Sequence, residues 1–321
     1  MKIRLQYILL IIGSLITLSV SAQQMPGFTQ YQSTIMYSNP AYAGMREGIC
    51  INGLMRQQWA GFSDTQRGDD VSPQTFLITV DSPVKVLHGG VGGSITQDVT
   101  GGLLKDVGLQ LSYSFHANLA FGTLGIGAGV NLINKSLDGS IFDPVVGGDP
   151  ALVTSEQGDM RADVNFGLFL MNPGRYYFGF AVNNILESNY KKLDPSGTDA
   201  GMKNDRTFVV NAGYNFVLNN PIFEIEPSLM VISDIASTQY NLSAIVTYNS
   251  RFWGGLNGRL GDFESIGVIV GVSFKDFRIG YAYDINMMGY SIPGSHEVSL
   301  GYCFKIKGDR SKTSYKNTRY L

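Results

Sequence analysis

Charged side chains are scarce in this sequence, cysteine is nearly absent, and no long apolar run follows residue 22. Asp, Glu, Lys and Arg make up 16% of the 321 residues. A membrane-spanning helix needs about 20 consecutive apolar residues, so the chain after residue 22 offers no candidate for one. Two cysteines do not make a disulfide framework. A formal net charge of −2 gives no reason to expect a nucleic-acid partner.

The first 22 residues have the pattern of a signal peptide. Lys2 and Arg4 supply the positive start, Ile8 to Val20 the apolar middle, and Val20-Ser21-Ala22 the small-residue cleavage site. We therefore expect an exported mature chain that starts at Gln23.

Alternation of apolar with small or polar residues marks most of the remaining chain. In the last such stretch, Val298 and Leu300 alternate with Ser299 and Gly301. This period of two is that of a β-strand with one apolar face. Most stretches have 9–11 residues, the length that crosses a bilayer when tilted. The fourteen predicted strands are Ile49–Trp59, Gln74–Asp81, Gly90–Asp98, Asp106–His116, Gly122–Asn134, Arg161–Met171, Arg175–Asn183, Thr207–Phe216, Phe223–Ser233, Gln239–Tyr248, Arg251–Leu260, Ser265–Phe274, Phe277–Ile285 and His296–Ile306.

The connections between these strands alternate in length. Even-numbered strands end in tight turns such as 172–174 and 249–250, whereas odd-numbered strands end in longer loops such as 60–73 and 184–206. Outer-membrane barrels have short periplasmic turns and long external loops. A soluble β-sandwich has no reason to keep this order. We therefore predict an all-β fold, a transmembrane antiparallel β-barrel of about 14 strands in the outer membrane, whose even strand number puts both termini in the periplasm.

Four parts are expected along the chain. They are a signal peptide (1–22), an N-terminal periplasmic or plug segment (23–48), the barrel (49–306) and a basic C-terminal tail (307–321). The tail is either disordered or a basic contact in the periplasm.

Cys50 and Cys303 lie on the predicted lumen faces of the first and last strands. These strands become neighbours if the barrel closes. Two readings stay open at this point: two small buried thiols, or a disulfide that joins the strands, which requires Cα atoms within about 7 Å.

No pattern in the sequence points to catalysis or to a metal. His88, His116 and His296 each lie near a predicted strand end, without a partner at ligand or catalytic spacing. The acidic loops have no spaced calcium-binding run. No glycine-rich phosphate loop precedes a helix. We therefore expect a non-enzymatic protein with no catalytic residues, no metal and no cofactor, surrounded by outer-membrane lipid.

Several short motifs run through the mature chain. They are Asn39-Pro40-Ala41-Tyr42-Ala43-Gly44, Arg56-Gln57-Gln58-Trp59, Asp81-Ser82-Pro83, Phe252-Trp253-Gly254-Gly255-Leu256, Phe277-Arg278-Ile279-Gly280-Tyr281-Ala282-Tyr283-Asp284 and Gly294-Ser295-His296-Glu297. Together they resemble the PorP/SprF family, outer-membrane proteins associated with the type IX secretion system of Bacteroidetes. The resemblance extends up to Ile306, and the basic tail reaches beyond it.

The resemblance implies a role in protein secretion and, in some relatives, in gliding motility. One kind of member (SprF-like) accompanies a large adhesin-like substrate to the cell surface. The other kind (PorP-like) sits with periplasmic ring lipoproteins and motor-linked components. The greater number of paralogues of the first kind favours it slightly. The competing interpretation is a hydrophobic-solute transporter, which should contain a continuous apolar pocket, or a porin-type channel.

The family supplies no catalytic set, so our hypothesis for a functional site comes from the N-terminal motifs. Arg56 faces the lumen if Ile49, Ile51 and Met55 face lipid, and it can then anchor the segment before the barrel by hydrogen bonds. The alternative is that these residues only stabilise the start of the barrel. The candidate partner-binding or plug residues are Asn39, Pro40, Ala41, Tyr42, Gly44, Arg56, Gln57 and Trp59.

Overall fold

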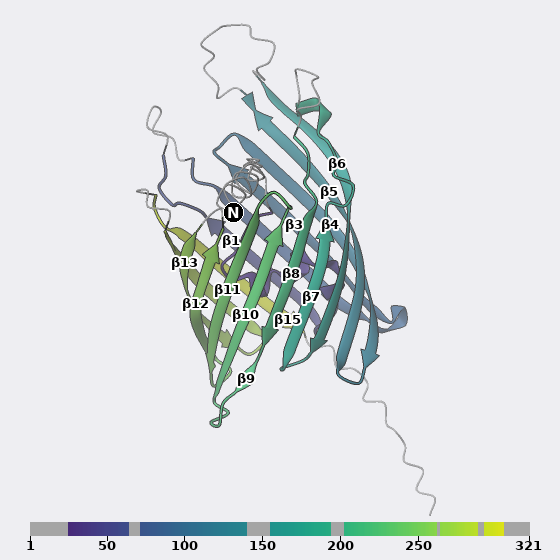
Figure 1. The fold of residues 1–321 in the computed structure, drawn as a ribbon, viewed down its shortest axis with the longest axis vertical. Helices are drawn as coiled ribbons and strands as arrows, with labels where there is room; N and C mark the ends of the chain where they lie inside the picture. Colours follow the sequence, from purple (N-terminus) through teal and green to yellow (C-terminus); the bar gives the residue numbers. More distant parts are fainter. Residues whose placement is uncertain are drawn as a thin grey trace, which may run out of the picture.

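The chain folds into a closed antiparallel β-barrel, seen here in a computed structural model that describes residues 25–63, 71–139, 155–193, 202–261, 264–287 and 292–304 (Figure 1). The expected signal peptide and basic tail lie outside the described residues. Consecutive strands pair with one another, and β15 pairs with β1 to close the barrel. The strands are β1 Ile49–Gln57, β2 Gln74–Val84, β3 Gly89–Thr100, β4 Leu104–Leu119, β5 Gly122–Asp138, β6 Glu156–Asn172, β7 Tyr176–Asn183, β8 Thr207–Tyr214, β9 Phe216–Val217, β10 Phe223–Ser233, β11 Thr238–Tyr248, β12 Phe252–Leu260, β13 Ser265–Phe274, β14 Phe277–Asn286 and β15 Ser295–Phe304.

The helices of the described residues are all short. They are η1 Tyr31–Ser33, α2 Ile35–Ser38, η2 Pro40–Tyr42, η3 Lys85–Leu87 and η5 Lys191–Leu193. None of them has the length and apolar character that a membrane-spanning helix needs.

Fourteen strands close the barrel, as predicted, and the short β9 is additional. The predicted strand Thr207–Phe216 is divided, because Asn215 leaves the ladder between β8 and β9. The Asn215 backbone N–H donates to the carbonyl of Arg175 at 2.7 Å, and its side-chain amide donates to Glu224 at 2.7 Å. Beyond this break, β9 pairs only with β10.

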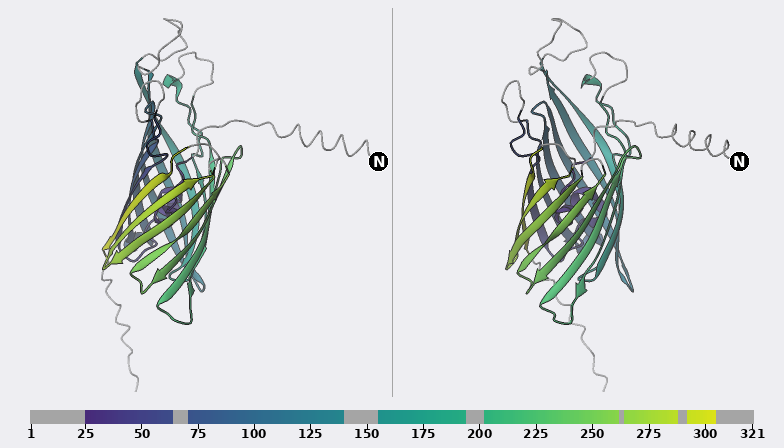
Figure 2. Two further views of the ribbon diagram at one scale, coloured as in Figure 1. Left: turned by 90° about the vertical axis from the view of Figure 1, so that its left-hand side faces the viewer. Right: turned by 60° about the vertical axis from the view of Figure 1, so that its left-hand side comes forward.

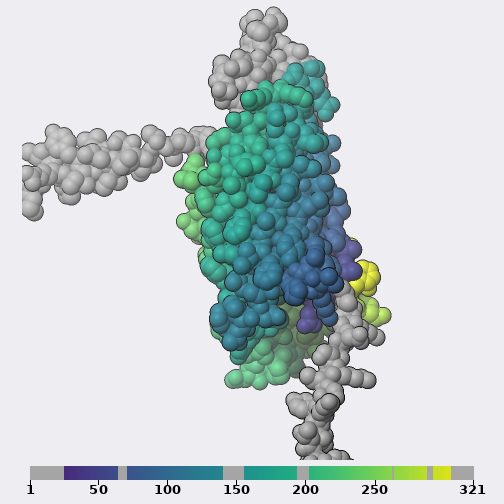
Figure 3. All heavy atoms as spheres, turned by 90° about the vertical axis from the view of Figure 1, so that its right-hand side faces the viewer, coloured from purple at the N-terminus to yellow at the C-terminus, as the bar shows by residue number. Residues whose placement is uncertain are grey.

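The two faces of the wall differ as the alternating pattern predicts. In β15, Leu300 is 50% exposed on the outside, whereas its neighbour Ser299 is 5% exposed on the inside. Apolar side chains recur at the outward positions of the other long strands, and Figure 3 shows the blue and teal strands as one unbroken wall. An apolar outer band with a polar interior is the arrangement of outer-membrane barrels. The protein is thus a multi-pass protein of the outer membrane.

The three longest strands are neighbours, and each is longer than predicted. β4, β5 and β6 have 16, 17 and 17 residues and rise beyond the other strands at one end of the barrel (Figure 1). The ladder continues to the pair Asp138 and Glu156. The added residues are mostly polar, so the sequence pattern of a lipid-facing strand stops before the hydrogen bonding does.

The two ends of the barrel differ in their connections. Long connections follow β1, β5, β7 and β14, and we call this the long-loop end. Short connections follow β6, β11 and β13, and we call the opposite end the turn end. Ile49 and Phe304 are paired with each other at the turn end.

Candidate functional site: a segment inside the barrel

Residues 25–48, the luminal segment, lie inside the barrel, where Figure 2 shows them as a purple coil among the strands. Met25 and Pro26 line a chamber at the long-loop end together with Thr100 and Leu104, and the segment joins β1 at the turn end. The prediction that both termini lie in the periplasm concerns residues outside the described ranges. Phe304 is at the turn end and Met25 is at the other, because the luminal segment crosses the barrel.

A buried ionic cluster holds the start of the luminal segment. Arg56 Nη2 lies 2.8 Å from Asp284 Oδ2, and Arg56 Nη1 lies 3.1 Å from Glu297 Oε2. Thr29 Oγ1 accepts from Arg56 Nη1 at 3.1 Å and donates to Asp284 Oδ1 at 2.6 Å. Charged hydrogen bonds of this kind are stronger than neutral ones, so the segment is bound where it enters.

The same cluster binds the backbone of the segment. Glu297 accepts the N–H groups of Thr29 at 2.9 Å and Gln30 at 2.7 Å. Arg259 donates to Asn241 at 3.1 Å and to the Gly27 carbonyl at 3.4 Å, and it lies 3.8 Å from Asp284. Two cations therefore face two carboxylates, so the buried charges balance, as they must in a site removed from water.

Asn39 holds the middle of the luminal segment in place. Its side chain is fully buried, and its polar atoms are hydrogen-bonded. Its Nδ2 donates to the backbone carbonyls of Leu168 at 3.1 Å and Phe180 at 3.3 Å. Its Oδ1 accepts the N–H of Ala41 at 3.0 Å and so caps η2, in which Pro40 is the first residue. One side chain thus joins the turn to the barrel wall.

Inward-facing glycines let this turn lie against the wall. A Cβ on Gly127 would lie 2.4 Å from Ala41 Cα, and one on Gly167 would lie 2.1 Å from Asn39 Oδ1. Both distances are far below van der Waals contact, so no larger residue fits there. Room for the luminal segment explains these two glycines.

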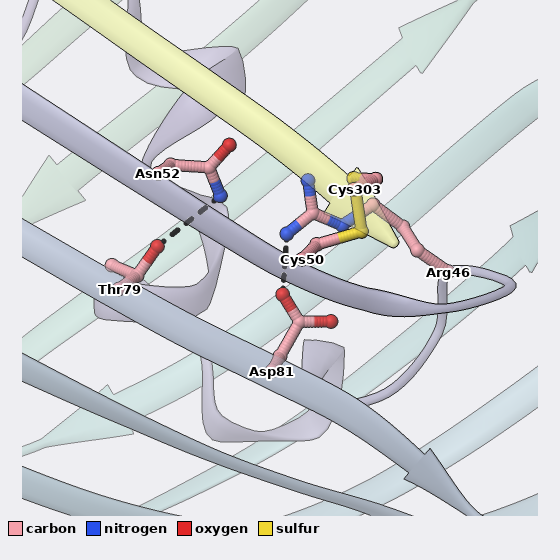
Figure 4. The surroundings of a disulfide bond; sticks show 6 residues. All are labelled: Arg46, Cys50, Asn52, Thr79, Asp81 and Cys303. Carbon is pink, nitrogen blue, oxygen red and sulfur yellow. Dashed lines mark hydrogen bonds and ion pairs between the residues drawn. A yellow bond between two sulfur atoms is a disulfide. The ribbon is translucent and has the colours of Figure 1, made fainter. Parts of the chain in front are cut away.

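The end of the luminal segment is held at the turn end. The Tyr42 ring packs edge-on against Phe169 with centroids 5.0 Å apart. Gly44 has a φ of +69°, and its Cα approaches Gly90 so closely that a Cβ on Gly44 would lie 2.6 Å from Gly90 Cα. The last anchor is an ion pair between Arg46 and Asp81 of β2 (Figure 4).

Gln57 and Trp59 lie apart from the Asn39–Gly44 turn. Gln57 ends β1 in register with His296 and Gln74. The Trp59 N–H donates to Ser295 Oγ at 3.1 Å, and its ring packs against Phe62 with centroids 6.1 Å apart. The candidate residues thus fall into two groups: the segment with its Arg56 anchor, and a pair at the long-loop end.

A disulfide joins the first and last strands. Cys50 and Cys303 are direct partners in the β1–β15 ladder, with Cα atoms 4.1 Å apart and their sulfur atoms bonded (Figure 4). The bond lies near the turn end, beside the Arg46–Asp81 ion pair. Both fasten the place where the luminal segment turns into the barrel.

Among the described residues, two larger chambers lie inside the barrel, and they have no lining residue in common. The outer chamber, about 180 Å³, opens among residues of the long-loop end such as Asp98, Asp106 and Lys135. Lys203 also lines it, and a hydrogen bond to Asp205 raises the pKa of the Lys203 ammonium. The inner chamber, about 280 Å³, is lined by residues of the turn end such as Tyr177 and Arg278.

Sequence reasoning missed the partners of Arg56, which are Thr29, Asp284 and Glu297. It also missed Arg259, the second cation of the cluster. The available signal was an ionised side chain at an inward position of a strand, in a chain with few charges. Such a residue needs an opposite charge inside the lumen. No group of three or more His, Cys, Asp or Glu in the described ranges could hold a metal ion.

Comparison of folds gives distant likenesses. A Pseudomonas aeruginosa FadL homologue is 11% identical with a TM-score of 0.49, and the match covers 85% of this chain and 94% of that one. The Ralstonia pickettii toluene transporter TbuX is 14% identical with a TM-score of 0.47 and the same coverages, 85% and 94%. The Acinetobacter baumannii outer membrane protein Omp33 is 6% identical with a TM-score of 0.46, covering 81% and 100%. At these values neither a substrate nor a transport function follows for this chain.

Comparison of sequences is more informative. No curated protein sequence matches the chain. A family model described as "Type IX secretion system membrane protein PorP/SprF" matches residues 20–302. This span includes the luminal segment and every strand except the last residues of β15. The chain belongs to the PorP/SprF family of type IX secretion system membrane proteins.

Proposed function

We propose that this protein is a closed barrel that binds a protein partner during type IX secretion and does not conduct a solute. The observation that carries the proposal is the luminal segment, which is anchored at Arg56, at Asn39 and at Arg46. Three anchors along one segment fix it across the lumen. The segment then acts as a plug, and the protein partner binds at one of the two mouths of the barrel.

The alternative of a hydrophobic-solute transporter has less support. Such a protein should contain a continuous apolar pocket. The described residues instead form two separate chambers, and the outer one is lined by charged and amide side chains such as Asp106, Lys135 and Asn165. A porin-type channel would need an open polar path, and the luminal segment occupies that place.

In the SprF-like form of this proposal, the protein partner lies at the cell surface. The extended ends of β4–β6 support it, because they offer a wall beyond the apolar band at the long-loop end. Met160 is 63% exposed on this extension. We propose that the long-loop end faces the cell exterior and that the partner is a large adhesin-like substrate. Phe304 then lies on the periplasmic side, and Met25 lies at the outer mouth.

The test is a mild-detergent pull-down of the tagged protein from its own outer membrane, followed by mass spectrometry. Recovery of a large surface adhesin near one-to-one supports the SprF-like role. Periplasmic ring lipoproteins instead would support the PorP-like role. Recovery of the barrel alone with a bound lipid or hydrocarbon would overturn the proposal and favour the transporter.

A pair of variants locates the binding end. Met160→Glu places a charge on the β4–β6 extension, and Val86→Glu places one at the turn end, where Val86 is 87% exposed. A surface partner should be lost with Met160→Glu and kept with Val86→Glu. The reverse result would indicate a periplasmic partner.

A further inference from the structure

We propose that the inner chamber is a binding site for a short zwitterionic peptide, with Arg278 as the carboxylate-binding residue and Glu226 as the ammonium-binding residue. The partner's source, a chain in the periplasm, rests on the proposed orientation of the barrel. The chemistry of the site is independent of that orientation, because it follows from the residues that line the chamber.

Arg278 is an inward residue of β14 that faces the chamber. Its guanidinium lies over the Trp253 ring, with Cζ 4.3 Å from the ring centroid. Across the residues that the structure describes, Arg278 has no ion pair and no hydrogen bond from its side chain. A guanidinium held by its face on an aromatic ring keeps its N–H edge free for a carboxylate.

Glu226 of β10 lines the same chamber. Within the described ranges, the Glu226 carboxylate likewise has no ion-pair or hydrogen-bond partner, and it is not within 4.0 Å of Arg278. The other charged residue of the lining, Arg46, is already paired with Asp81. The chamber thus presents one unpaired cation and one unpaired anion, and a ligand that carries both charges satisfies the two together.

The rest of the lining suits the body of a small peptide. Tyr42, Phe169 and Tyr177 form an aromatic group, in which Phe169 and Tyr177 are stacked with centroids 5.9 Å apart. A volume of about 280 Å³ is near the lower end of ligand pockets, which span roughly 300–1,000 Å³. This size fits a dipeptide or the end of a longer chain.

The chamber has a path to the turn end. A groove of about 120 Å³ lined by Asn172, Arg175 and Tyr214 shares Tyr177 and Glu226 with the chamber. Asn172 and Arg175 flank the tight turn after β6. A peptide can therefore reach Glu226 and Arg278 without displacing the luminal segment.

The experiment measures binding of the dipeptide phenylalanyl-alanine to the full-length protein in detergent. Trp253 reports binding, because the only other tryptophan, Trp59, lies at the long-loop end. Trp emission should change with the free dipeptide and stay constant with its N-acetylated, C-amidated form. Arg278→Gln and Glu226→Gln should each weaken binding at least tenfold. Lys275→Gln, which removes an exposed cation in the turn between β13 and β14 at the same end, is the control and should bind normally.

Retention of the folded band on an unheated gel shows for each variant that the barrel is intact. Equal binding of the free and capped dipeptides, or no binding of either to the wild-type protein, would overturn the inference. Because the measurement uses the purified barrel, a failed pull-down leaves this result unaffected, and a negative result here leaves the secretion role standing.

Discussion

Arg56 and Glu297 face each other across the seam between β1 and β15, with Arg56 Nη1 3.1 Å from Glu297 Oε2. The same carboxylate accepts two backbone N–H groups of the luminal segment, those of Thr29 and Gln30. One buried carboxylate therefore connects the closure of the barrel to the position of the segment inside it. Changes at this pair should affect both.

Arg56→Ala should destabilise the protein by about 3–5 kcal/mol, because it leaves Asp284 and Glu297 buried without their main cation. The measurement is the free energy of unfolding in urea, in detergent or lipid. Arg206→Ala is the matched control. Its side chain is 41% exposed and 3.6 Å from Glu187, and exposed pairs contribute about 0–1 kcal/mol. Equal losses in both variants would contradict a role for the buried cluster.

Gly127→Ala should push the luminal segment away from the wall. The new Cβ would lie 2.4 Å from the Cα and N atoms of Ala41, and overpacking of this kind costs about 1–3 kcal/mol. Limited proteolysis of the folded barrel, with mass spectrometry of the fragments, should show new cuts between Tyr31 and Tyr42. At Gly258 an added Cβ has no atom within 4 Å, so Gly258→Ala should give the wild-type fragments.

The Cys50–Cys303 disulfide should be present in the exported protein, because compartments outside the cytoplasm are oxidising. Unfolded protein should then resist alkylation until a reductant is added, and it should run faster on a non-reducing gel. Cys50→Ser with Cys303→Ser should lower stability by about 2–5 kcal/mol, the usual contribution of a native disulfide. Alkylation of both thiols in unreduced protein would contradict this prediction.

The sequence predicted the barrel because lipid imposes a regular pattern on every strand. Outward residues such as Val298 and Leu300 must be apolar, whatever the rest of the protein does. Beyond the lipid-facing part of the wall, the predicted strand ends were wrong. The ends of β5 and β6 around Asp138 and Glu156 are hydrogen-bonded strand without an apolar face, so their alternation could not be distinguished from a polar loop.

The interior site was only half predictable. Counting from Ile49 places Arg56 on the inner face, because alternate residues of a strand share a side. Its partners Asp284 and Glu297 are 228 and 241 residues away, and only the register of the closed barrel brings them together. The path of the luminal segment has no periodic signal at all. It is set by single side chains such as Asn39, which bond to the backbone of the wall.

The position of Met25 gives the sharpest test of how the barrel sits in the membrane. A cysteine at Met25 should react with a membrane-impermeant maleimide on intact cells, because Met25 lines the outer chamber at the long-loop end. Asn220→Cys lies in the exposed turn between β9 and β10 and should react only after the outer membrane is permeabilised. The native cysteines give no background, because both are in the disulfide. Labelling of Asn220→Cys but not Met25→Cys on intact cells would reverse the proposed orientation, and it would place the inner chamber, not the outer one, on the cell surface.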